Sequence, residues 1–98
     1  MMSNRQEEFT NFAWIIKNHI ENYTVNQYGD SPFDPVEKWT ATQCMDSVKR
    51  YADRIDTNRR GHLESLRDMA KIAHFACLAF WKLAPTEEEI QKIIDGAI

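Results

Sequence analysis

Residues 62–83 read HLESLRDMAKIAHFACLAFWKL, and this stretch decides the fold of the chain. Its apolar residues recur at intervals of three and four, which is typical of one face of an α-helix. Between Ile72 and Trp81 no residue is charged, so the second half of the helix is apolar around its whole circumference. In a chain of 98 residues, such a segment is either central or covered by another subunit. We therefore predict a helix that mediates homodimerisation.

The first half of this predicted helix has two different sides. At about 100° per residue, the charged side chains gather on one side, which we expect to face solvent. Phe75 and Leu78 are apolar, but they lie on the same side of the helix as these charged residues, one turn further along. We expect a partner subunit to bury one of them. The apolar side, predicted to face the core, comprises Leu63, Leu66, Ala70, Ala73, Cys77 and Phe80, and the charged side comprises Glu64, Arg67, Asp68 and Lys71.

The same spacing predicts three further helices. The first covers residues 7–28 and ends at Gly29, and its apolar stripe is Phe9, Phe12, Ala13, Ile16, Ile20 and Tyr23. The second begins after a capping box formed by Thr40 and Gln43, and its inner side is Met45, Val48, Ala52 and Ile55. A short last helix follows Pro85, with a second capping box at Thr86 and Glu89 and an end at Gly96. Residues 28–35 are rich in Gly, Pro and Asp and predict a loop, with Phe33 and Trp39 as its anchors on the core.

These elements predict an all-α fold. We expect one domain over residues 1–98, built as a small bundle of three main helices plus a short C-terminal helix. The helices over residues 41–55 and 62–83 should form an antiparallel pair. A hydrophobic fraction of 43% with 3 Gly and 3 Pro excludes a disordered or collagen-like chain.

Composition also limits where the protein acts. No stretch reaches the roughly 18 uncharged apolar residues of a membrane span, and charges within the first twenty residues interrupt any signal-peptide core. We therefore expect a cytoplasmic protein without a membrane partner. Cys44 and Cys77 lack any CxxC or Cys/His spacing, so we predict two buried thiols and not a metal or redox site.

Motifs for nucleophilic catalysis and nucleotide loops are absent from the sequence. It contains no P-loop, GxGxxG turn, HExxH pair or EF-hand loop. His74 and Cys77 are three residues apart, but in an apolar run we interpret His74 as a core histidine. What remains is a set of four carboxylates on two helices, which could hold Mg²⁺ together with a phosphate. They are Asp46, Asp53, Glu64 and Asp68.

Three segments carry a resemblance to a known family. They are Gln27-Tyr28-Gly29-Asp30, the helix that ends in Lys49-Arg50-Tyr51-Ala52-Asp53-Arg54-Ile55, and the run from Glu64 to Ala76. Together, over roughly residues 27–80, they resemble the all-α nucleotide pyrophosphohydrolases of MazG type. Within that group they look like the short, often phage- or prophage-associated members. The resemblance implies a dimeric helical bundle, Mg²⁺ held by acids of two neighbouring helices, and hydrolysis of a nucleoside triphosphate to a monophosphate and pyrophosphate.

Carried over residue by residue, this resemblance implies Mg²⁺ ligands and phosphate-binding residues. Glu64 and Asp68 match the acidic positions of the family's third helix, although their spacing is four and the family's is three. On the second helix, where the family has ExxE, this chain has Asp46 followed by Lys49 and Arg50. The implied Mg²⁺ ligands are Glu64 and Asp68 with Asp46 or Asp53, and the implied phosphate-binding residues are Lys49, Arg50 and Arg54.

A plainer interpretation of these charges is surface ion pairing. Asp46 with Arg50, and Lys49 with Asp53, have the i,i+4 spacing of pairs on a wet helix face. Under this interpretation the protein needs no cofactor, whereas the nucleotide hypothesis requires Mg²⁺. The basic cluster of Arg54, Arg59, Arg60 and Arg67 also suggests nucleic acid, but the net charge of -3 and an inter-helix gap too long for a helix-turn-helix make that partner unlikely.

Two functional hypotheses therefore stay open. The first is a non-catalytic, homo-oligomeric interaction module, which the basic residues in place of the second ExxE acid favour. The second is a Mg²⁺-dependent nucleotide-binding or nucleoside triphosphate pyrophosphohydrolase-like protein, which the family resemblance favours.

Overall fold

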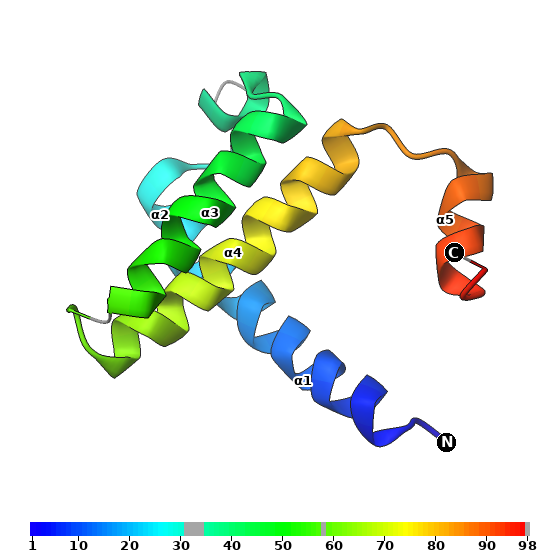
Figure 1. Cartoon of the computed structure of the whole chain (residues 1–98), viewed down its shortest axis with the longest axis horizontal. Coiled ribbons are helices and arrows are strands. Elements are labelled where there is room, and N and C mark those ends of the chain that lie inside the picture. Colours follow the sequence, from blue (N-terminus) through cyan, green and yellow to red (C-terminus); the bar gives the residue numbers. More distant parts are fainter. Residues whose placement is uncertain (31–34, 58, 98) are drawn as a thin grey trace.

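The computed structural model describes residues 1–30, 35–57 and 59–97, and these residues form helices and no strand. The order is α1 (Asn4–His19), a π-helical segment η1 (Ile20–Thr24), α2 (Val25–Tyr28), a 3-10 turn η2 (Pro35–Lys38), α3 (Ala41–Thr57), α4 (His62–Lys82) and α5 (Glu87–Ile94). Helices α3 and α4 pack along each other as an antiparallel pair, and the first helix crosses α4 (Figure 1). The predicted all-α bundle is confirmed.

The N-terminal helical segment begins earlier than its apolar stripe predicts. The hydroxyl of Ser3 accepts a hydrogen bond from the backbone N–H of Gln6 at 3.1 Å, so the helix begins at Asn4 and not near residue 7. The segment runs on to Tyr28, with one π turn where the N–H of Val25 donates to the carbonyl of Ile20. It ends at Gly29, whose φ of 82° lies in the region that favours glycine.

The two predicted capping boxes are both present. Gln43 N–H donates to the Thr40 hydroxyl at 3.2 Å, and Thr40 N–H donates back to the Gln43 side chain at 2.8 Å. Thr86 and Glu89 make the same reciprocal bonds at the start of α5. Of the two loop anchors predicted, Trp39 stacks on Phe75 with a ring-centroid distance of 6.1 Å, and Phe33 lies outside the described residues.

The charged side of α4 packs against α3, which corrects the sequence-based assignment of its faces. Asp68 is only 3% exposed, and Glu64 and Lys71 are half-buried. On α3, Cys44 is fully buried and Ser47 is 4% exposed. Arg54 of α3 supplies the counter-charge for the buried Asp68, and Glu64 pairs with Arg67 of its own helix.

The apolar stripe of α4 that the sequence places in the core is mostly exposed to solvent. Leu63 is 68% exposed and Leu66 51%, while only Ala70, near the crossing with α1, is buried. Cys77 is exposed, so its predicted burial is wrong for the single chain, whereas that of Cys44 is confirmed. Phe75 is one of the two residues that we expected a partner subunit to bury. In the structure it stacks between Trp39 and Tyr51 of its own chain.

The chain is expanded because both of its ends project from the α3–α4 pair. The N-terminal half of α1 and the whole of α5 extend away as two arms with an open wedge between them (Figure 1). The radius of gyration is 15.1 Å, against about 13 Å for a compact domain of this length. No helix in the described part of the chain has the length and apolarity needed to cross a membrane.

Candidate functional site

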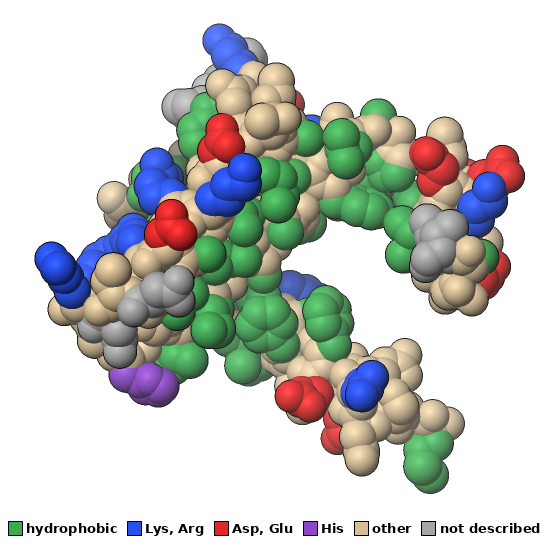
Figure 2. Space-filling view, in the orientation of Figure 1, with side chains coloured by type: hydrophobic (Ala, Val, Ile, Leu, Met, Phe, Trp, Pro, Cys, Tyr) green, Lys and Arg blue, Asp and Glu red, His purple; other side chains and the backbone are tan. Residues whose placement is uncertain are grey.

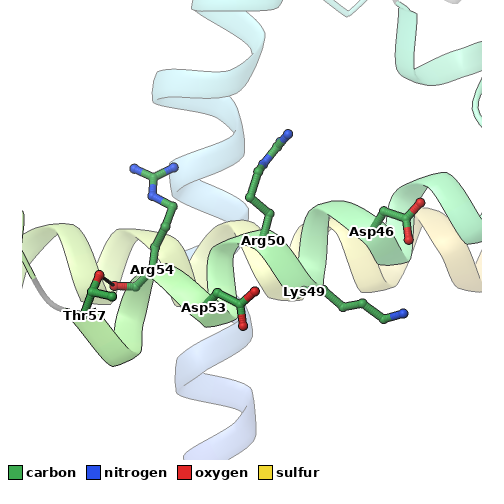
Figure 3. Close-up of a pocket in the computed structure, with 6 residues that line it drawn as sticks. All are labelled: Asp46, Lys49, Arg50, Asp53, Arg54 and Thr57. Atoms are coloured by element: carbon green, nitrogen blue, oxygen red, sulfur yellow. Dashed lines mark hydrogen bonds between the residues drawn. The ribbon is translucent and has the colours of Figure 1, made fainter.

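The phosphate-binding candidates predicted from the sequence lie on the outer face of α3. Lys49, Arg50 and Arg54 line an open depression of about 500 Å³ together with Asp46, Asp53 and Thr57. All six residues come from one helix, so this feature is a charged surface and not a cleft between elements. Arg50 and Arg54 point to the same side of α3, and Lys49 points elsewhere (Figure 3).

The i,i+4 ion pairs expected on this face are not formed. Among the described residues, Asp46, Lys49, Arg50 and Asp53 make no ion pair within 4.0 Å. All four are exposed, as expected for residues on a wet helix face. Surface ion pairs contribute little to stability, so their absence is no obstacle to folding.

A second, smaller hollow of about 230 Å³ lies between the end of α3 and the start of α4. Arg54 Nε lies 3.8 Å from Asp68 Oδ2, and the Asp68 side chain is 4% exposed. The other oxygen, Oδ1, is buried and has no hydrogen-bond partner. Glu64 lines the same hollow and pairs with Arg60 and Arg67, each at 3.1 Å. Arg54 links the two hollows because it lines both.

The four carboxylates proposed as Mg²⁺ ligands do not converge within one chain. Asp46 and Asp53 face outward from α3, whereas Glu64 and Asp68 face the α3–α4 contact. Among the described residues, no three His, Cys, Asp or Glu side chains form a group that could hold a metal ion. A set of ligands drawn from both helices would need a second chain.

A cluster of tyrosines and cations, which sequence reasoning missed, joins three helical segments. Lys71 Nζ of α4 lies 5.2 Å from the ring centroid of Tyr51 in α3 and 5.9 Å from that of Tyr23 in η1. Arg50 and Arg54 lie over the Tyr51 ring, both at 5.3 Å, and Arg67 lies over the Tyr23 ring at 5.7 Å. We call Tyr23, Tyr51, Lys71, Arg50, Arg54 and Arg67 the tyrosine–cation cluster. The apolar spacing assigns Tyr23 to the stripe of the first helix. Spacing along the chain does not reveal which helices cross, so it cannot predict this cluster.

Two histidines border this cluster. His19 stacks on Tyr23 with a centroid distance of 5.1 Å, and its Nε2 is buried without a hydrogen-bond partner. Burial lowers the pKa of His19 below its ordinary value of 6.5, and the positive charges of Arg67 and Lys71 lower it further. Burial also lowers the pKa of His74, with a smaller contribution from His19. His74 therefore has the partly buried setting of a core histidine.

Large apolar side chains are exposed along α4 and on the α1 arm. Figure 2 shows hydrophobic side chains along the wedge between the two arms. On the arm, Phe9 and Trp14 are 68% and 65% exposed. We call the following set the open apolar face: Leu63, Leu66, Met69, Phe80 and Trp81 of α4, with Phe9, Phe12, Trp14 and Ile15 of α1.

Comparison of the chain with protein-family models, with curated proteins and with solved structures finds no match. The functional argument therefore rests on the chain's own geometry.

Proposed function

We propose that this protein is a cytoplasmic, non-catalytic interaction module that functions as a homodimer, and that the open apolar face is the surface that a second copy covers. The observation that carries the proposal is the inverted packing of α4. Its charged side is used inside the chain, while its apolar stripe, the better candidate for a core, faces outward. Exposed apolar patches of this extent are rare on monomers.

The surface area of the chain supports a second copy as the occupant. A compact monomer of 11.5 kDa exposes roughly 5,800 Å², whereas this chain exposes 7966 Å². If each of two chains buried the difference, their interface would cover about 4,300 Å² in total, within the range of obligate homodimers. A two-fold dimer would lay the α1 arm of each chain in the wedge of the other, pairing aromatic residues of α1 with Phe80 and Trp81 of α4.

A charge placed in the open apolar face tests this proposal. In Leu66→Glu, dimerisation would bury an unpaired carboxylate, so we expect dimer stability to fall by about 2 kcal/mol or more. Size-exclusion chromatography with light scattering should then show a monomer. Met45→Glu is the matched control, because Met45 is 41% exposed on α3 and lies off the face; it should remain a dimer. A Leu66→Glu chain as dimeric as the wild type would reject this interface.

A second proposal is Mg²⁺-dependent nucleotide binding, with pyrophosphohydrolase-like activity and a phage or prophage association. It rests on the sequence resemblance, and one observation favours it: the buried, unpartnered Asp68 Oδ1 in a hollow that Glu64 also lines. A buried carboxylate oxygen without a hydrogen-bond partner can coordinate a cation. Nucleoside triphosphates should raise the melting midpoint only when Mg²⁺ is present, and Glu64→Gln should remove the effect. Identical midpoints with and without Mg²⁺ would refute this proposal.

A further inference from the structure

The tyrosine–cation cluster concentrates positive charge that the chain does not neutralise. Arg54 is paired with the buried Asp68. Arg60 and Arg67 share the single carboxylate of Glu64. Among the described residues, Arg50 and Lys71 have no carboxylate within 4.0 Å. The cluster and its ion-pair partners therefore comprise five cations and two carboxylates: Arg50, Arg54, Arg60, Arg67 and Lys71 against Glu64 and Asp68.

Phenol hydroxyls stand beside these cations. The rings of Tyr23 and Tyr28 meet edge to face at 6.5 Å. The pKa of the Tyr28 hydroxyl is raised, first by its interaction with Tyr23, then by burial, by a hydrogen bond with Tyr23 and by interaction with Tyr51. The Tyr23 and Tyr28 rings are thus neighbours, and Tyr51 presents its ring to Lys71, Arg50 and Arg54. A hydroxyl, an ammonium and guanidinium groups at one place are the donors that bind phosphate oxygens.

The cluster is accessible and does not overlap the open apolar face. Tyr28 is 62% exposed, the Arg67 side chain is 37% exposed and Lys71 is half-buried. Around the axis of α4, Lys71 lies about 140° from Leu66 at 100° per residue. A ligand at Lys71 and a second chain at Leu66 therefore occupy different sides of the helix.

We propose that the tyrosine–cation cluster is a binding site for a phosphate dianion, either free or as the terminal group of a phosphate ester, with Lys71 and Tyr51 as its central contacts. The site needs no metal, and it is independent of the proposed dimer. It shares Arg50 and Arg54 with the phosphate-binding residues of the Mg²⁺ hypothesis, but it does not use Glu64 or Asp68 as metal ligands. Lys71 is held between two tyrosine rings, so its ammonium is positioned before the ligand arrives, which lowers the entropic cost of binding.

Isothermal titration of the full chain tests the proposal, with inorganic phosphate and phenyl phosphate as probes, at constant ionic strength and with a chelator. We expect Lys71→Gln to weaken binding of the preferred probe by at least about tenfold, because a charge-assisted bond is lost. Tyr51→Phe, which preserves the ring and removes only the hydroxyl, should weaken it several-fold. Lys92→Gln is the matched control, because Lys92 is an exposed cation on α5, which makes no extensive contact with the other described helices. Its affinity should equal that of the wild type.

The result distinguishes the two sources and can overturn the proposal. Tighter binding of inorganic phosphate identifies the free ion, and tighter binding of phenyl phosphate identifies an ester. A bound dianion should also raise the pKa of His19, followed by NMR, because it screens Arg67 and Lys71. The proposal fails if neither probe binds, or if Lys92→Gln weakens binding as much as Lys71→Gln, since that would indicate general charge attraction.

Discussion

At the scale of single residues, His19 and His74 connect stability to pH. Both have a pKa below 6.5 in the folded chain, mainly because they are partly buried. As pH falls through 6.5, the unfolded chain therefore takes up protons that the folded chain resists, and the free energy of unfolding should decrease. Denaturant unfolding between neutral and mildly acidic pH measures this. The decrease should be smaller in His19→Gln, and stability independent of pH in this window would contradict the assignment.

Residue-scale features divide into those that local sequence fixes and those that depend on packing. The caps at Thr40 and Thr86 were predictable because every partner lies within three residues. The burial of Asp68 was not, since a helical wheel ranks positions by polarity and cannot know that Arg54 of another helix supplies the counter-charge. The tyrosine–cation cluster was missed for the same reason, as its members come from three helical segments.

At the scale of elements, α5 is the least integrated helix. It makes no extensive contact with any other described helix, and its capping box supports it locally. Removing residues 87–98 from the monomeric Leu66→Glu chain should therefore change the free energy of unfolding of the remaining helices by less than about 0.5 kcal/mol. Denaturant unfolding followed by circular dichroism measures the change.

A substitution in the packed part of the chain provides the control for this truncation. Ile16 is 8% exposed where the first helix crosses α4, so Ile16→Ala should cost about 2 kcal/mol or more. A loss of that size on removing α5 would mean that α5 packs against this chain.

The helices themselves could be predicted, but the use of their faces could not. Apolar spacing placed α4 at residues 62–83, one residue longer than the observed His62–Lys82. The same spacing assigned its apolar stripe to the core of the chain, because a sequence pattern does not say whether a stripe is covered by its own chain or by a second copy. The structure places the charged side inside and leaves most of the stripe open.

At the scale of the whole molecule, the open wedge and the excess surface are the features that support the proposed homodimer. Two arms diverge from a central pair of helices, and large apolar residues line the space between them (Figures 1 and 2). Few side chains are fully buried, so the hydrophobic contribution within one chain is small. Self-association would supply the missing burial, and folding and dimerisation should then be one coupled transition.

Sedimentation equilibrium of the wild-type chain over a wide concentration range is the most direct test of this account. We predict a single species with twice the 11.5 kDa mass of the chain down to submicromolar concentration, because an obligate homodimer has no stable folded monomer. A folded species of 11.5 kDa at all concentrations would contradict the central claim, because the open apolar face would then be stable in water.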